Sequence, residues 1–314
     1  MYILDIHEDI IQTHILTKVN GQTLANMACT SSHLQSLCSN QKLWSNICSS
    51  NWPSTNHPLI TRSIANHRSL FGDSFPSPSH HLTTATSSPP IDKIISAVDL
   101  KYHDQVVLSK AVSTNTTPTK WFQTSPFRVD LVEPKEIIPS CVKVTVNERV
   151  MQSNLESNMT LSWIMIDPIQ KRAVNLSSIK PVFVQKNWLT EEIELSFCIV
   201  IDTDKSYVNC NIEVTCGVNE GSEELYVSGV SLTIQDMDGK CLSGKGSLVI
   251  LQGLMAAARR CNGGGKVMKE RYDEFIQKRN ERKEMMERRE RRLDLACVAS
   301  GLTFLMVFWS FALY

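Results

Sequence analysis

The sequence predicts an α+β protein built from three kinds of structure along the chain. Aliphatic residues recur at helical spacing in the first fifty residues, apolar and polar residues alternate between 91 and 254, and the last twenty residues carry no charge. These observations predict a small N-terminal helical region, an antiparallel β-sandwich-like middle domain, and a C-terminal charged helix followed by one transmembrane helix.

Composition sets limits on function. A chain of 314 residues with a formal net charge of zero accommodates about two domains, and its overall charge does not favour nucleic acid as a partner. None of its ten cysteines has C-x-x-C spacing, so we expect free thiols, a reducing compartment, no metal site and no cofactor. Asp5, Glu8 and Asp9 stand where a signal peptide needs basic and apolar residues.

The first predicted region covers residues 4–52. Its apolar positions fall at helical intervals: Ile10, Ile11, Ile15, Leu16, Leu24, Leu34, Leu37, Leu43 and Trp44. We expect Asn20-Gly21 to end the first helix, Thr23 to cap the second, and Ser31 or Ser32 to cap the third. Helices this short are marginal alone, so they need one another or a partner.

Residues 53–90 predict a partly helical segment that runs into a Ser/Thr/Pro-rich linker. From 91 to 258 the pattern changes to a period of two residues, as in Val142, Val144 and Val146. Turn signals such as Asp167-Pro168 and Asp238-Gly239 separate the alternating runs. Many short strands with few helical stretches between them predict an antiparallel sandwich or barrel, which would bind a substrate through loops or a strand edge.

The C-terminal part divides into a glycine hinge at 263–265, a charged helix at 266–292, and an apolar run at 295–314. About 20 apolar residues suffice to cross a bilayer, so the run predicts a tail anchor, the alternative being a buried helix of the globular domain. The membrane-contacting residues would be Leu295, Leu302, Phe304, Leu305, Val307, Phe308, Trp309 and Phe311. The arginines between 288 and 292 predict that the rest of the chain faces the cytosol, at an endomembrane that the pattern does not specify.

The N-terminal motif resembles an F-box. Ile6-His7-Glu8-Asp9-Ile10-Ile11 is similar to the usual opening Leu-Pro-x-Asp/Glu-Leu/Ile-Leu/Ile, and Leu43-Trp44 is similar to the closing Leu-Trp. Ile15-Leu16, Val19 and Thr23-Leu24 match intermediate positions of the motif. The chain departs from the usual pattern at His7 and Asn20, where proline is common, and at Thr30-Ser31-Ser32.

The middle region is similar to a group of plant F-box proteins, so the resemblance covers nearly the whole chain. The similarity rests on four segments: Trp121-Phe122, the run from Ser125 to Leu131, Leu161-Ser162-Trp163-Ile164, and the run from Arg172 to Ser178.

This resemblance implies a non-catalytic substrate receptor in a Skp–cullin–F-box ubiquitin ligase. The implied partners are a Skp-type adaptor, through it a cullin, and an unidentified protein substrate. The implied adaptor-binding residues are Ile6, Ile10, Ile11, Ile15, Leu16, Val19, Leu24, Leu34, Leu37, Leu43 and Trp44, with Leu16 and Trp44 contributing most. Trp121, Phe122, Trp163 and Trp188 are candidate substrate anchors, although a place in the core is the favoured interpretation for each.

Other interpretations remain open from the sequence. The N-terminal apolar residues would serve a purely structural role if they packed only against the middle domain. The protein would then be a tail-anchored tether with a peptide-binding β-sandwich and no ligase role. A third interpretation is a carbohydrate-binding sandwich that uses its tryptophans to stack on sugars.

Overall fold

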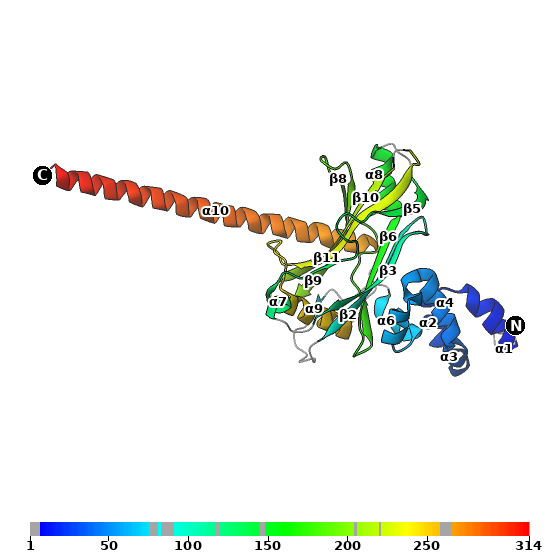
Figure 1. The fold of residues 1–314 in the computed structure, drawn as a ribbon. Helices are drawn as coiled ribbons and strands as arrows, with labels where there is room; N and C mark the ends of the chain where they lie inside the picture. The colour runs from blue at the N-terminus through cyan, green and yellow to red at the C-terminus, as the bar shows by residue number, and fades with distance from the viewer. Residues whose placement is uncertain are drawn as a thin grey trace. The chain divides into compact units, whose positions relative to one another are not determined.

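The computed structural model describes residues 7–75, 81–82, 91–116, 120–144, 148–203, 206–219, 221–257 and 265–313. The chain divides into two compact units, residues 1–269 and 270–314. The first contains helices and two β-sheets, and the second is part of one long helix (Figure 1). The α+β class predicted from the sequence is confirmed.

The N-terminal region is helical throughout its described part. Its elements are α1 (Glu8–Ile10), the π-helical η2 (Ile11–Ile15), the 3₁₀ turn η3 (Leu16–Lys18), α2 (Gly21–Ala28), α3 (Ser32–Cys38), α4 (Gln41–Asn51), η4 (Pro53–Asn56), α5 (Pro58–Ser63) and α6 (His67–Ser74). The predicted helical character of 4–52 is confirmed for its described residues.

One predicted cap was wrong. Asn20, not Thr23, caps α2: the Thr23 backbone N–H donates to Asn20 Oδ1 at 2.8 Å. Asn20 has the extended backbone of a cap residue, and its side chain reaches the third helical N–H. The helix therefore begins at Gly21. Ser31 caps α3 as one of the two predicted candidates, accepting from the Leu34 N–H at 3.2 Å.

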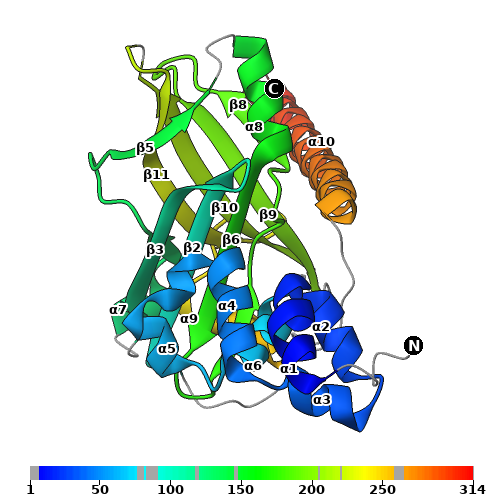
Figure 2. The same cartoon turned by 90° about the vertical axis from the view of Figure 1, so that its right-hand side faces the viewer.

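Two sheets form the middle of the chain (Figure 2). Sheet A has the order β1-β9-β10-β11-β4, with β5 paired to β11 and β8 to β9, and sheet B has the order β3-β2-β6-β7. Every pairing is antiparallel except that of β1 with β9. The strands are β1 (His81–Leu82), β2 (Lys93–Tyr102), β3 (Gln105–Asn115), β4 (Arg128–Asp130), β5 (Ile138–Lys143), β6 (Met159–Asp167), β7 (Arg172–Asn175), β8 (Phe183–Lys186), β9 (Ile193–Thr203), β10 (Tyr207–Val218) and β11 (Glu224–Gln235).

Alternating residues of both sheets share one core. Phe197, Ile212 and Leu232 from sheet A join Val98 and Trp163 from sheet B in a single buried cluster. The period-two pattern predicted this layered arrangement, because successive side chains of a strand point to opposite faces.

Three helices of the middle region were not predicted: α7 (Lys120–Thr124), α8 (Glu148–Asn158) and α9 (Gly244–Ala257). The alternation assigned up to residue 254 was wrong over α9. Ser247, Leu251 and Leu254 are buried at intervals of four and three residues, which is the spacing of one helix face. The Ser243 hydroxyl accepts from the Gly246 N–H at 3.3 Å at the start of this helix.

The second unit belongs to α10 (Gly265–Ala312), a single helix of 48 residues. The predicted hinge lies partly outside the described residues, and Gly265 itself begins the helix. No described residue interrupts the helix between the charged stretch and the apolar tail, so the two predicted segments are continuous. Ion pairs four residues apart, Arg288 with Glu284 and Arg291 with Glu287, lie along the charged stretch.

Candidate functional site

Most of the apolar residues that resemble F-box positions are buried within unit 1. Ile11, Leu16, Leu24, Leu34, Leu37, Leu43 and Trp44 belong to one cluster. That cluster also contains Ile95, Ala97, Ile164, Ile166 and Ala173, which lie on the outer face of sheet B. The helical region therefore completes its core both within itself and against the sheet.

The two residues expected to contribute most to adaptor binding are fully enclosed. Leu16 is 0% exposed and Trp44 is 1% exposed. The Trp44 indole N–H donates to the Cys38 carbonyl at 2.7 Å, and its ring lies 5.4 Å from the ring of Phe71. Direct contact of a partner with these two side chains would need the core to open.

Three apolar residues of the motif remain accessible. Ile10 is 48% exposed, and Ile15 and Val19 are half-buried. Ile6 lies outside the described residues. The accessible residues come from α1, η2 and the segment before α2, so they follow one another along the first turns of the region.

A groove of about 390 Å³ is lined by one of these three residues, Val19. Leu16, Val19 and Gly21 line one part of it, and Leu43 and Ile47 of α4 line another. The polar residues Lys18, Asn46, Ser50 and Asn51 also line the groove. Sequence reasoning did not assign Ile47 to the site, although its spacing from Leu43 and Trp44 placed it on the same face of α4.

Polar contacts join the helical region to sheet B. The Ser54 N–H and hydroxyl donate to the Asp99 carboxylate at 2.9 and 2.6 Å, and the Ser109 hydroxyl donates to it at 2.7 Å. Burial raises the pKa of the Asp99 carboxyl, and these hydrogen bonds oppose the rise. The Trp52 indole N–H donates to Ser162 Oγ at 3.1 Å.

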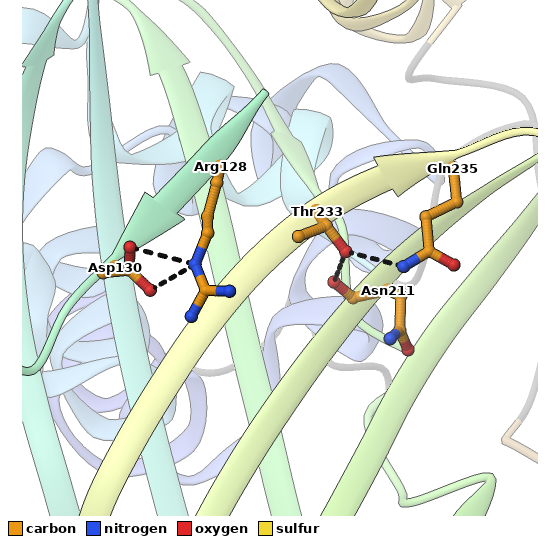
Figure 3. Close-up of polar contacts among 5 residues, drawn as sticks. All are labelled: Arg128, Asp130, Asn211, Thr233 and Gln235. Atoms are coloured by element: carbon orange, nitrogen blue, oxygen red, sulfur yellow. Dashed lines mark hydrogen bonds and ion pairs between the residues drawn. The ribbon is translucent and has the colours of Figure 1, made fainter. Parts of the chain in front are cut away.

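Polar side chains lie on the outer face of sheet A along β4, β10 and β11 (Figure 3). Asn211 and Thr233 alternate with the core residues of their strands and so point away from the sandwich core. Thr233 Oγ1 donates to the Asn211 carbonyl and accepts from Gln235 Nε2 at 3.2 Å. On the neighbouring strand, Arg128 Nε pairs with Asp130 at 2.8 Å. This face offers hydrogen-bonding groups, whereas the outer face of sheet B is partly apolar and covered.

The four candidate substrate anchors divide into two pairs. Trp163 is fully buried, and Phe122 packs against the sandwich core. Trp121 on α7 and Trp188 in the β8–β9 turn are 78% and 89% exposed. Only the second pair is placed to contact a partner as the chain stands.

The thiols have little nucleophilic character where they are buried. Each of the nine described cysteines is free. Burial raises the pKa of Cys48, Cys210 and Cys216 to about 12, so these groups stay protonated at neutral pH. Within the described ranges, no three His, Cys, Asp or Glu side chains gather as metal ligands would.

The apolar end of α10 is long and apolar enough to cross a membrane by length and composition. Leu295, Leu302, Phe304, Leu305, Val307, Phe308 and Trp309 are exposed along it, and Phe311 lies in the same helix. The hydroxyls of Ser300, Thr303 and Ser310 donate to carbonyls of their own helix at 2.7–2.8 Å, which suits a segment without water around it.

A short helical region with accessible apolar residues packs on a β-sandwich, and accessible apolar residues that lie together are typical of protein-docking surfaces. Comparison with known proteins gives the family. F-box protein At2g27310 of Arabidopsis thaliana is 39% identical over 98% of this chain and 95% of its own length. Probable F-box protein At2g36090 of the same plant is 41% identical over 98% and 93%, and F-box protein At3g44326 is 38% identical over 96% and 87%.

The chain belongs to the plant F-box proteins. No family model matches it. No solved structure matches it either.

Proposed function

We propose that this F-box protein is the substrate-recruiting subunit of a Skp–cullin–F-box ubiquitin ligase and that its C-terminal helix tethers it to a membrane. In this proposal residues 4–52 bind the adaptor and residues 91–258 bind the substrate, with 53–90 as the connection between these two parts. Residues 266–292 act as a charged spacer, and residues 295–314 span the bilayer. Ubiquitin transfer itself is carried out by the other subunits, so the chain contributes binding and positioning, not catalysis.

The observation that carries the proposal is a set of accessible apolar residues in the helical region, Ile10, Ile15 and Val19, which we call the apolar rim. Ile10, Ile15 and Val19 are accessible, and Val19 lines a groove that an adaptor side chain can enter. An exposed isoleucine surrounded by polar residues is the kind of anchor that gains free energy on burial, about 25 cal/mol per Å² of apolar surface. Leu16 and Trp44 then act through the fold, because they hold the helices that present this rim.

The test is co-purification of the full-length chain with a Skp-type adaptor. Ile10→Glu places a charge on the rim without touching the core, and we expect it to weaken retention of the adaptor by at least about tenfold. Ile169→Glu is the matched control, because Ile169 is also exposed but lies in the β6–β7 turn. Adaptor retention by wild type that Ile10→Glu leaves intact would place the interface elsewhere, and no retention by wild type would favour a tether without ligase role.

The membrane part of the proposal rests on the continuous helix α10. Its apolar end follows four arginines, Arg288, Arg289, Arg291 and Arg292, and cytosolic flanks of membrane spans are enriched in such residues. We propose that unit 1 faces the cytosol at an endomembrane and that the arginines contact anionic lipid head groups, each with about 1 kcal/mol.

A further inference from the structure

The β8–β9 hairpin carries three large apolar side chains that are open to solvent. Trp188 and Leu189 in its turn are 89% and 73% exposed, and Phe183 on β8 is 46% exposed. Figures 1 and 2 both show β8 and α8 at the end of the sandwich opposite to α7 and α9. Accessible apolar side chains gathered in one short segment are typical of interaction sites, and the adaptor interface proposed above does not include them.

Hydrogen bonds hold the turn of this hairpin in one shape. Asn187 Oδ1 accepts from the N–H groups of Leu189 and Thr190 at 2.9 and 3.4 Å. The Asn187 N–H donates to the Glu192 carbonyl at 2.8 Å, and the Glu191 N–H donates to the Asn187 carbonyl at 2.9 Å. A partner that binds the turn therefore has little backbone to order, which lowers the entropic cost of binding.

Carboxylates share the outer face of sheet A with one of the apolar residues. Phe183 lies opposite Ser196, and Ser196 lies opposite Glu213, so these three form one row across β8, β9 and β10. Glu194 is two residues before Ser196 on β9, and Leu195 between them belongs to the sandwich core. Because side chains alternate along a strand, Phe183, Glu194 and Glu213 all point away from that core.

The charge of this part of the chain has one sign. Glu191 and Glu192 add two carboxylates in the turn. Within the described residues of 183–219, Lys186 is the only lysine or arginine, and it alternates with Phe183 and so points to the other face. A basic partner is attracted to such a surface, and an acidic partner is repelled.

Neutral donors hold one of the carboxylates in place. Gln185 Nε2 and Asn187 Nδ2 donate to the two oxygens of Glu194 at 2.6 and 2.9 Å. Both donors are uncharged amides, so they position the carboxylate without neutralising it. A cationic group of a partner can therefore still pair with it.

The indole of Trp188 determines which cations fit best. Arginine and lysine side chains are attracted to the face of an aromatic ring, most strongly to that of tryptophan. A guanidinium group can also pair with a carboxylate through two parallel hydrogen bonds. Leu189 and Phe183 add apolar area that a large apolar side chain of the same partner can cover.

We propose that these residues bind an arginine- or lysine-containing segment of a protein substrate that also carries a large apolar side chain. The surface consists of Phe183, Trp188, Leu189, Glu191, Glu194 and Glu213, and we call it the β8–β9 surface. This proposal names the class of segment that the substrate-binding part of the chain recognises, so it rests on the proposed function.

The experiment probes an array of random synthetic peptides with the fluorescently labelled full-length chain in an uncharged detergent. We expect the retained peptides to be enriched both in arginine or lysine and in large apolar residues. Fluorescence anisotropy then measures the affinity of the best retained peptide, which should fall as sodium chloride is raised. Enrichment of acidic peptides, no enrichment, or an affinity that does not depend on salt would overturn the proposal.

Trp188→Ala tests the aromatic part of the surface. The ring is almost wholly exposed, so its removal leaves the core untouched, and we expect the affinity for the selected peptide to fall at least about tenfold. Trp121→Ala is the matched control, because Trp121 is 78% exposed but lies on α7 at the opposite end of the sandwich. Loss of binding in Trp121→Ala with intact binding in Trp188→Ala would move the site to α7.

Glu213→Gln tests the charge. It keeps the Oε1 that accepts from Asn211 Nδ2 at 2.9 Å, and we expect about a two- to fivefold loss of affinity at low salt. Glu133→Gln is its control, because Glu133 is exposed in the β4–β5 loop, beyond β11 from the β8–β9 surface. Binding like wild type by both Trp188→Ala and Glu213→Gln would overturn the proposal.

The same variants separate this proposal from the ligase role. Peptide binding is measured without the adaptor, and adaptor retention by Trp188→Ala and Glu213→Gln should equal that of wild type. Failure of the peptide experiment with intact adaptor retention would reject the β8–β9 surface and leave the ligase proposal standing. Loss of adaptor retention by wild type with intact peptide binding would reject the ligase role and leave a peptide-binding sandwich.

Discussion

Arg172 on β7 and Asp73 on α6 form an ion pair that ties the helical region to sheet B. Arg172 Nε lies 2.9 Å from Asp73 Oδ2, and the Ala173 N–H also donates to this oxygen at 3.3 Å. The Asp73 side chain is 1% exposed, whereas that of Arg172 is 28% exposed. Together with the bonds of Ser54 to Asp99, this pair fixes the N-terminal helices relative to the sandwich. In the proposed ligase complex, a bound substrate and an adaptor would therefore keep a defined spacing.

Removing the cation of this pair should destabilise the chain more than removing an exposed one. Arg172→Ala removes the guanidinium group that donates two hydrogen bonds to the enclosed Asp73 carboxylate, and we expect a loss of about 2–3 kcal/mol in the free energy of unfolding. Arg128→Ala is the matched control, because Arg128 pairs with Asp130 at 2.8 Å with both side chains about half exposed. Its expected cost is below about 1 kcal/mol. Denaturant unfolding of both variants checks the difference, and equal losses would show that enclosure of the pair adds nothing.

Gly21 and Gly72 should respond in opposite directions to the same substitution. A Cβ at Gly21 would lie 2.3 Å from the ring of Phe71, so Gly21→Ala must displace a ring that packs on Trp44 and Trp52. We expect a loss of about 1–3 kcal/mol. Gly72 is an exposed position of α6 with open space around its Cβ, so Gly72→Ala should gain up to about 1 kcal/mol through helix propensity.

Thermal unfolding measured by circular dichroism compares these two glycine variants with wild type. A neutral or stabilising Gly21→Ala would contradict the close packing of α2 on α6. A destabilising Gly72→Ala would contradict its assignment to the helix interior.

Asp99 should make stability fall as the pH rises above the ordinary carboxyl range. Its pKa in the folded chain is raised above 3.8, mainly by burial, so between 3.8 and that raised value the folded state binds more protons than the unfolded state. The contribution of Asp99 to the free energy of unfolding therefore decreases with rising pH in that window and is constant beyond it. Asp99→Asn lacks this decrease, so its free energy of unfolding minus that of wild type should rise from acid toward neutral pH.

Unfolding curves of wild type and Asp99→Asn at matched pH values measure this difference. Parallel pH profiles would mean that solvent reaches the carboxylate well enough to remove the shift. A free energy of unfolding of Asp99→Asn that falls relative to wild type toward neutral pH would give the opposite sign and contradict the role of burial.

How far the sequence predicted the molecule depended on the kind of contact involved. Local patterns sufficed for the helical character near Leu24 and for the alternation that produces β9 to β11, because both follow from side-chain periodicity. The Asn20 cap was misassigned because Asn20, Gly21 and Thr23 all carry signals for a helix end. The hydrogen bond from the Trp52 indole to Ser162 joins segments far apart in the chain, and no local pattern predicts it.

In the candidate sites, too, local patterns predicted some features, whereas others depend on contacts between distant segments. The motif identified the helical region, but the difference between an accessible Ile10 and an enclosed Leu16 depends on what α6 and sheet B cover. The bonds of Ser54 and Ser109 to the buried Asp99 join three separate segments of the chain, so no local pattern predicts them.

The membrane proposal predicts that charge in the apolar end of α10 abolishes anchoring. Leu302→Arg combined with Leu305→Arg places two guanidinium groups in the middle of the proposed span, at about 2.5–3.5 kcal/mol each for insertion at a bilayer centre. We expect the variant to be released by carbonate washing, which should leave wild type in the membrane pellet. The control is Met285→Arg combined with Met286→Arg, because both methionines are exposed in the charged stretch and lie outside the apolar run. Release of wild type, or retention of the double-arginine variant, would contradict a spanning helix and favour a peripheral role for this segment.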